Sequence, residues 1–219
     1  MIDLILDDCM NVMKKYEDNH FDLAIVDPPY GGAGDNKLEK GGRFGGRFDK
    51  YKVSRTGGGY AKKYGKKIID WDSAPPKEYF DELFRVSKNQ IIWGGNYFGL
   101  PPNRCFLIWR KLTISESFTM AMCEYAWCSF NSNSKWIEIV PQGKNRFHPT
   151  QKPVKLYDWI LKHYAEKGQK ILDTHLGSGS VAIACHNFGI DLVGIEIDPE
   201  YFEKAKNRID LETKQESLF

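Results

Sequence analysis

The pattern of apolar and polar positions divides the chain into alternating strands and helices. Short apolar runs bounded by turn-forming residues predict buried strands, and apolar residues three or four positions apart predict helices. Strands are expected at residues 1–6, 21–26, 90–93, 105–109, 124–130, 170–173 and 191–198. Helices are expected at 10–16 and 79–87, from residue 154, from residue 181, and at 199–209. This order predicts an α/β domain with a mixed, mostly parallel sheet and helices on both faces, and short links around 110–123 favour some antiparallel pairing.

Size and composition indicate a single domain over residues 1–219. A chain of this length buries a full core, and no apolar run approaches the length of a membrane span. The opening residues lack the basic segment of a signal peptide. The five cysteines are scattered without a C-x-x-C pair, which is typical of reduced core thiols in a cytoplasmic protein. We therefore expect a cytoplasmic protein without a metal site.

Positive charge is concentrated in residues 31–70, although the whole chain carries only +2. This segment holds 11 of the 20 glycines, and its 11 bases against 4 acids leave the remaining chain at −5. Interleaved aromatic residues make the composition typical of an insertion that grips phosphates and bases, although long loops are also often solvated and disordered. The candidate nucleic-acid-contact residues are Arg43, Arg47, Lys50, Lys52, Arg55, Lys62 and Lys63.

A strand over residues 21–26 ends directly in Asp27-Pro28-Pro29-Tyr30. Pro28 biases Asp27 away from helical backbone, and each proline removes a backbone donor, so the strand must stop here. Ligands of open α/β sheets bind at such strand ends. Asp27 and the Pro28 carbonyl can accept from the two N–H groups of an exocyclic amine, while Tyr30 stacks on the ring that carries it. The alternative is a proline-terminated strand before an ordinary loop.

This tetrapeptide resembles motif IV of the amino-directed DNA methyltransferases, which methylate adenine N6 or cytosine N4. His148-Pro149-Thr150-Gln151-Lys152-Pro153 resembles motif X of the same family and directly precedes a predicted helix. A helix N-terminus with a lysine suits a carboxylate. The resemblance therefore implies that His148, Thr150 and Lys152 bind the methionine end of S-adenosylmethionine. A proline-punctuated loop with a surface lysine is the alternative.

A glycine turn follows the strand at 170–173 and resembles motif I of that family, usually D-x-F-x-G-S-G-T. Gly177 and Gly179 permit positive φ and close backbone approach to a ligand. Glu196 follows the glycine turn by about 20 residues, the distance expected for a carboxylate on ribose hydroxyls. A dinucleotide fold is the rival, but the turn lacks the third glycine of that fingerprint. The candidate cofactor residues here are Asp173, Leu176, Gly177, Ser178, Gly179, Glu196 and Ile197.

Asp8 and Cys9 follow the first predicted strand. They resemble motif III, in which an acidic residue meets the adenine of the cofactor. An aspartate placed before a helix is also common for capping alone, so both interpretations stay open.

The motif order, with the catalytic block before motif X and the cofactor block, resembles the β group of these enzymes. It implies an S-adenosylmethionine-dependent DNA adenine-N6 methyltransferase that acts on a flipped-out base, with Asp27, Pro28, Pro29 and Tyr30 as catalytic residues. Asp27, where cytosine-N4 enzymes more often carry serine, favours adenine. Only residues 131–145 are available for a target-recognition region, so either the insertion reads sequence or recognition is short. The alternatives are a cytosine-N4 enzyme, a catalytically silent nucleic-acid-binding module, and methylation of RNA or of protein glutamine.

Residues 210–219 form a predicted polar tail. Its last five residues, Gln215–Phe219, resemble the Q-x-x-L-F peptides by which bacterial DNA enzymes bind the replication sliding clamp. The alternative is that Leu218 and Phe219 pack on the protein's own core. The family resemblance also makes a homodimer plausible.

Overall fold

The computed structural model describes residues 1–30, 73–117, 121–141 and 146–215. The predicted insertion at 31–70, with all of its candidate DNA-contact residues, lies outside the described residues. None of the described helices is long and apolar enough to span a membrane.

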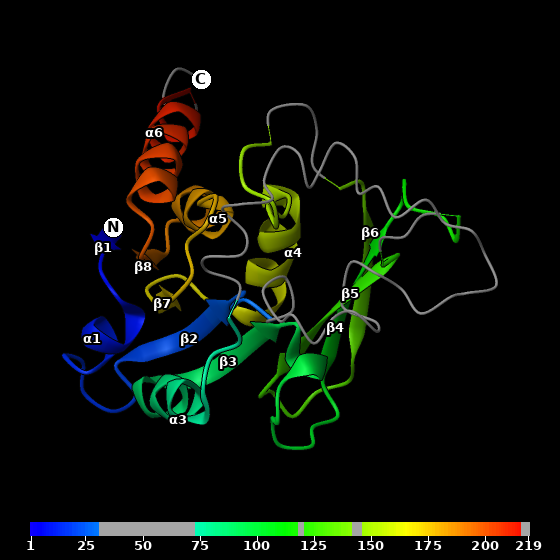
Figure 1. The fold of residues 1–219 in the computed structure, drawn as a ribbon, viewed down its shortest axis with the longest axis horizontal. Helices are drawn as coiled ribbons and strands as arrows, with labels where there is room; N and C mark the ends of the chain where they lie inside the picture. The colour runs from blue at the N-terminus through cyan, green and yellow to red at the C-terminus, as the bar shows by residue number, and fades with distance from the viewer. Residues whose placement is uncertain (31–72, 118–120, 142–145, 216–219) are drawn as a thin grey trace.

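The described residues form one sheet of eight strands (Figure 1). Their order across the sheet is β1-β8-β7-β2-β3-β5-β4-β6. Among these strands β5 runs antiparallel to both of its neighbours, and the other pairings are parallel. The predicted mixed, mostly parallel sheet is therefore confirmed. The strands are β1 (Ile2–Leu6), β2 (Phe21–Val26), β3 (Ser87–Trp93), β4 (Phe106–Lys111), β5 (Cys123–Cys128), β6 (Lys135–Ile139), β7 (Lys170–Asp173) and β8 (Asp191–Glu196).

Helices cover both faces of this sheet, as the sequence predicts (Figure 1). The apolar residues of α4, α5 and α6 join one core cluster, and those of α1 and α3 join a second cluster on the other face. The described helices are α1 (Cys9–Met13), α3 (Lys77–Val86), α4 (Val154–Tyr164), α5 (Ser180–Phe188) and α6 (Pro199–Gln215), with a short 3₁₀ turn η2 at Gly95–Tyr97.

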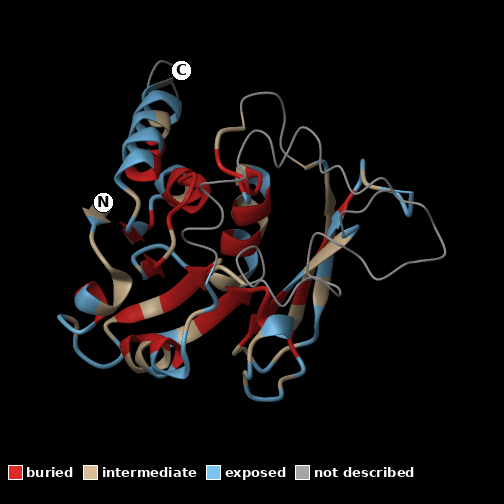
Figure 2. Cartoon of the chain, viewed as in Figure 1, coloured by how far each residue is buried: buried red, intermediate tan, exposed pale blue. Residues whose placement is uncertain are grey.

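Strand β2 is central to the sheet and is buried along nearly its whole length (Figure 2). Alternate side chains of a strand point to opposite faces. Accordingly, Leu23 and Ile25 pack in the first core cluster, whereas Ala24 and Val26 pack in the second. Burial on both faces explains why the sequence of this strand is mostly apolar. The buried strand also holds Asp27, the next residue, at a fixed position.

The structure differs from the sequence-based expectations at two places. Residues 135–139 form the edge strand β6, which pairs in parallel with β4 and is not among the strands expected from the sequence. Its side chains are mixed in polarity and Trp136 is 63% exposed, so it lacks the apolar signal of a buried strand. The closing helix also continues past Ile209 to Gln215. Residues 210–215 are therefore helical rather than part of a tail, and 216–219 lie outside the described residues.

Candidate active site

The candidate site lies at the carboxyl ends of β2 and β7, which are neighbours in the sheet. Asp27 follows β2 and Asp173 ends β7. The chain connections lead away in opposite directions on the two sides of this point, which is where open α/β sheets leave a crevice. A pocket opens here, lined by Ile25, Asp27, His148, Thr150, Gln151, Lys152, Tyr157, Asp173, His175, Leu176, Ser178, Ser180 and Val181.

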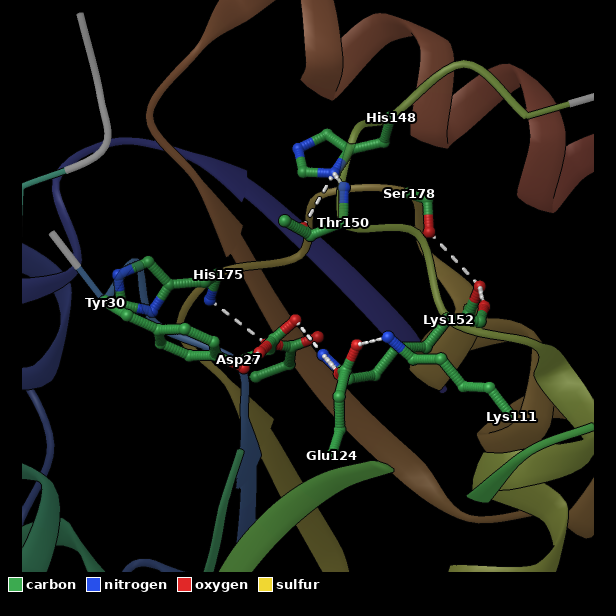
Figure 3. Close-up of polar contacts among 11 residues, drawn as sticks. Asp27, Tyr30, Lys111, Glu124, His148, Thr150, Lys152, His175 and Ser178 are labelled. Atoms are coloured by element: carbon green, nitrogen blue, oxygen red, sulfur yellow. Dashed lines mark hydrogen bonds and ion pairs between the residues drawn. The ribbon is translucent and has the colours of Figure 1, made fainter. Parts of the chain in front are cut away.

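Both carboxylate oxygens of Asp27 accept hydrogen bonds within the protein (Figure 3). The Tyr30 hydroxyl donates to Oδ1 at 2.7 Å, and the Lys152 ammonium donates to Oδ2. The Tyr30 ring packs so closely on Gly94 that a Cβ there would lie 2.1 Å from a ring carbon. Gly94 also has φ +68°, so glycine is required on both counts. These contacts fix the carboxylate and the ring of the Asp27–Tyr30 tetrapeptide relative to each other.

The Lys152 ammonium is buried between two carboxylates. Besides Asp27 it contacts Glu124 at 3.3 Å, and Glu124 also pairs with Lys111 at 2.5 Å. Burial opposes the charged form of Lys152, but Asp27 and Glu124 outweigh it and raise the pKa of Lys152. Burial likewise opposes ionisation of Glu124, but Lys152 and Lys111 lower the pKa of Glu124 to about 2. Four side chains thus alternate in charge from Asp27 to Lys111 (Figure 3).

The contacts of Lys152 differ from those expected from the sequence. The lysine expected to face a cofactor carboxylate donates instead to two carboxylates of the protein. An ammonium group has three donors, so these contacts leave capacity for one further bond. Lys152 also lines the pocket, and its contact with the cofactor stays a prediction.

His148 and Thr150 form the opposite wall of the pocket. The Thr150 hydroxyl lies 3.2 Å from Nδ1 of His148, and the His148 ring meets the Tyr201 ring edge-on at 4.4 Å. Burial lowers the pKa of His148 to about 3, with the charges of Arg146 and Lys152 adding to the effect. His148 is therefore a neutral wall of the pocket at physiological pH.

The glycine turn between β7 and α5 is tied to the end of β8. Gly177 and Gly179 have φ of +54° and +75°, which confirms the predicted positive φ. Glu196 accepts from the Gly177 amide at 2.8 Å, and its other oxygen accepts from Ile197 and Asp198 at 3.1 and 3.0 Å. Glu196 thus braces the turn from beside the pocket, and its bond to a ribose stays a prediction.

Asp173 is buried next to the glycine turn and accepts from the His175 amide at 3.1 Å. Burial raises the pKa of Asp173 to about 8, and the charges of Asp27 and Glu196 act in the same direction. A neutral carboxyl therefore lies close to the charged Asp27.

Asp8 caps α1, because its side chain accepts from the Met10 amide at 2.7 Å. The capping interpretation is thus confirmed for Asp8. Asp8 and Cys9 follow β1, whose last residue pairs with Glu196, so they lie at the same edge of the sheet. They are not among the residues that line the pocket, and their contact with a cofactor stays a prediction.

The pocket brings together seven candidates that are far apart in the sequence. Asp27, His148, Thr150, Lys152, Asp173, Leu176 and Ser178 all line it. Gly177, Gly179, Glu196 and the exposed Ile197 belong to the adjoining turn and strand end. Among the described residues, no three His, Cys, Asp or Glu side chains gather into a metal-binding group.

The polar residues of the site that the sequence did not indicate include Lys111, Glu124, Gln151 and His175. Lys111 and Glu124 stand at the ends of apolar strands, where charged residues are usually solvated. A weak signal was available for Gln151, which lies inside the motif X segment. Nothing in the order of residues indicates that Glu124 meets a lysine 28 positions later.

The comparisons with known proteins agree with this geometry. A family model described as DNA methylase of the N6/N4 class matches residues 92–207. The type II methyltransferase M.HpaI of Haemophilus parainfluenzae is 27% identical over 95% of this chain and 74% of its own length. The M1.HpyAVI–SAM complex has a TM-score of 0.57 and 19% identity, covering 95% of this chain and 100% of the other. The cytosine-N4-specific PvuII DNA methyltransferase has a TM-score of 0.59 and 10% identity, covering 98% and 92%.

At these identities the two solved structures show a common fold, and the family model supplies the assignment. It matches more than half of the 219 residues, including motif X, the glycine turn and Glu196. The chain belongs to the N6/N4 DNA methylase family.

Proposed function

We propose that this DNA methyltransferase transfers the methyl group of S-adenosylmethionine to the exocyclic N6 of adenine. The observation that carries the proposal is the Asp27 carboxylate, held between the Tyr30 hydroxyl and the Lys152 ammonium at a strand end. A planar base with an exocyclic amine meets there an acceptor for its N–H groups and an aromatic ring for its face.

The cofactor is S-adenosylmethionine, and the residues around the pocket suit it. A side chain at Gly179 would come within 2.8 Å of Ile209, so glycine lets the turn pack closely against α6 beside the pocket. We assign the methionine carboxylate to Thr150 and the remaining donor of Lys152, and the ribose to Glu196. When bound, the sulfonium supplies an electrophilic methyl group.

Asp27 and the Pro28 carbonyl make the amine reactive by accepting its two hydrogens. The lone pair of N6 is delocalised into the adenine ring, so the free amine is a poor nucleophile. Two acceptors favour a pyramidal nitrogen whose lone pair points to the methyl group. The N–C bond forms as the C–S bond breaks, and the extra proton leaves the nitrogen during or after transfer. The enzyme contributes position and electrostatics.

The target base must leave the duplex to reach Asp27. Flipping costs a few kcal/mol, which stacking on Tyr30 and phosphate contacts offset. We assign the phosphate contacts to the basic insertion at 31–70, on its net charge of +7. Arg43, Arg47, Lys50, Lys52, Arg55, Lys62 and Lys63 supply part of this charge.

Adenine is favoured over cytosine by Asp27 itself, since cytosine-N4 enzymes more often begin the tetrapeptide with serine. A cytosine-N4 activity is the second candidate, because the fold is shared with the cytosine-N4-specific PvuII enzyme. Both reactions use the same acceptors, so the identity of the base needs a direct measurement.

Two partners are proposed from the sequence alone, a second copy of this chain and the sliding clamp. Because Gln215 is the last described residue of α6, clamp binding by an extended Gln215–Phe219 peptide requires the end of that helix to open. A pull-down with purified clamp should retain the full chain and release a chain that ends at Lys214. Equal retention of both chains would show that residues 215–219 do not bind the clamp.

The function is tested with purified protein, labelled S-adenosylmethionine and duplex DNA, followed by mass spectrometry of the nucleosides. N6-methyladenine is the expected product, and Asp27→Ala is the inactive control. N4-methylcytosine without N6-methyladenine would overturn the base assignment. An RNA competitor in the same assay distinguishes the nucleic acids, since preferential labelling of RNA would contradict a DNA substrate.

A further inference from the structure

Glu124 reaches the candidate site because β5 is antiparallel to its neighbours β3 and β4. Strands β2, β3, β4 and β7 have their carboxyl ends at this edge of the sheet, whereas β5 brings its amino end there. Glu124 pairs in register with Trp109, next to the end of β4, and Ala126 pairs with Trp93 at the end of β3. The reversed strand thus delivers a carboxylate to the edge of the sheet that carries Asp27.

The Glu124 carboxylate is shared between two lysines. Oε2 lies 3.3 Å from Nζ of Lys152, and Oε1 lies 2.5 Å from Nζ of Lys111. Both lysine side chains are less than 10% exposed, and the Glu124 side chain is 26% exposed. The Lys152 ammonium also lies over the Trp93 ring, 5.1 Å from its centroid. Such buried pairs tolerate the loss of one member poorly, because a charge is left uncompensated.

Lys152 needs this second carboxylate to keep its position. A lysine side chain has several rotatable bonds, so a single hydrogen bond to Asp27 does not fix the position of the ammonium group. Glu124 holds the same ammonium from another strand, so Lys152 is clamped between β2 and β5. Through Lys152 the clamp also fixes the rotation of the Asp27 carboxylate, whose other oxygen is fixed by Tyr30.

We propose that Glu124 is a positioning residue for methyl transfer, which holds the Lys152 ammonium on Asp27 so that the carboxylate stays correctly turned towards the target amine. The inference rests on the proposed function, since it assigns a second-strand support to the same site. Nothing in the role requires Glu124 to touch the base or the cofactor.

The charges that face Lys152 come from several elements. Asp27 follows β2, Glu124 lies on β5, the buried Asp173 ends β7, and neutral His148 lies in the same segment as Lys152. Asp173 is protonated below about pH 8, so Glu124 and Asp27 are the carboxylates that keep Lys152 charged. Replacing Glu124 by a neutral residue leaves burial in place and removes one of them, which lowers the pKa of Lys152.

The first experiment compares Glu124→Gln with Glu138→Gln. Glutamine keeps the size of the side chain and removes its charge. Glu138 is a matched control, because it lies on β6, pairs with Arg110 of the neighbouring strand β4, and is 32% exposed. At saturating DNA and cofactor, Glu124→Gln should lower kcat roughly tenfold to hundredfold, the effect of a small misplacement of a reacting group. Glu138→Gln should stay within about twofold of the wild type. A wild-type kcat in Glu124→Gln would overturn the proposal.

The second experiment measures the charge of Lys152 without methyl transfer. Nitrogen NMR of the labelled lysine side chains should show the Lys152 signal titrating at lower pH in Glu124→Gln than in the wild type. The alkaline limb of kcat should move in the same direction. Reduced kcat with an unchanged Lys152 titration would mean that Glu124 only supports the fold, and would overturn the proposal.

Glu124→Asp covers the case in which the glutamine variant does not fold. It keeps the charge on a shorter side chain, so its Lys152 titration should stay near that of the wild type while kcat falls less than in Glu124→Gln. If the Lys152 signal of Glu124→Asp titrated at the same pH as lysines in the unfolded chain, that result would contradict the clamp. A wild type that fails to methylate DNA would contradict the proposed function. The NMR titration needs no substrate, so it tests the clamp on Lys152 independently of that result.

Discussion

The ring of Tyr97 stacks on the ring of Tyr30, with centroids 4.9 Å apart and planes 21° apart. Tyr97 is 56% exposed and lies on the 3₁₀ turn that follows β3, whereas Tyr30 donates its hydroxyl to Asp27 at 2.7 Å. The Tyr30 ring is thus held at its hydroxyl by the Asp27 carboxylate and across one face by a second aromatic ring. The proposed function assigns base stacking to this fixed ring.

Tyr30→Ala and Tyr30→Phe separate stacking from hydrogen bonding at this position. Loss of base stacking costs about 1–3 kcal/mol, so Tyr30→Ala should lower kcat/KM for DNA by roughly 5- to 150-fold. Tyr30→Phe keeps the ring and loses only the bond to Asp27, so its loss should be smaller. Steady-state kinetics on both variants provide the check. Equal losses would mean that the hydroxyl, rather than the ring, carries the effect.

Glu196→Gln tests the support of the cofactor turn. The carboxylate accepts from three backbone amides, and we propose that it also accepts from ribose hydroxyls. Loss of one charge-assisted bond costs about 1.5–3 kcal/mol, so calorimetry should show cofactor affinity lower by roughly 10- to 150-fold. Glu138→Gln serves again as the control. Unchanged cofactor affinity in Glu196→Gln would remove the ribose assignment.

Asp173 predicts a dependence of stability on pH. Its pKa rises from 3.8 to about 8 in the folded chain, so between these values the folded state holds one more proton than the unfolded state. This contribution is fully present below the unfolded pKa and is lost as the pH rises through about 8. Its slope is at most about 1.4 kcal/mol per pH unit.

Denaturant unfolding of the wild type and Asp173→Asn between pH 5 and 8 measures this slope. The wild type should lose stability relative to Asp173→Asn as the pH rises. The buried histidines have lowered pKa values and act in the opposite direction, but they are present in both proteins. A constant difference in unfolding free energy across this range would show that Asp173 does not carry the extra proton.

Neutralising Arg43, Arg47, Lys62 and Lys63 together should weaken DNA binding and its salt dependence. Each lost phosphate contact lowers the magnitude of the slope of log K against log salt by about 0.9. Binding titrations at several salt concentrations give this slope for both proteins. An identical slope would mean that these four residues do not contact the DNA backbone.

The sequence predicts the strands and helices around the site because each of them leaves a local signal. Asp27 follows a doubly buried strand that ends at two prolines, and Gly177 and Gly179 occupy backbone positions with positive φ. Motif X lies directly ahead of α4, as predicted. These features depend on residues that are neighbours in the sequence, so the sequence alone predicts them.

The charged contacts of the site depend on pairing across the sheet and are not visible in the sequence. Lys152 was assigned to the cofactor, but its partners Asp27 and Glu124 come from β2 and β5. Their approach follows from the strand order and from the reversal of β5. The edge strand β6 and the last turns of α6 were missed for a related reason, since exposed elements carry a weak apolar pattern.

Sequencing that detects modified bases is the decisive test of whether Asp27 directs methyl transfer to adenine N6 in DNA. DNA is taken from cells that express the wild type or Asp27→Ala, with calorimetry confirming that the variant still binds S-adenosylmethionine. N6-methyladenine is expected at a defined DNA sequence with the wild type, and none with Asp27→Ala. N4-methylcytosine in its place, or equal modification by both proteins, would contradict this role of Asp27.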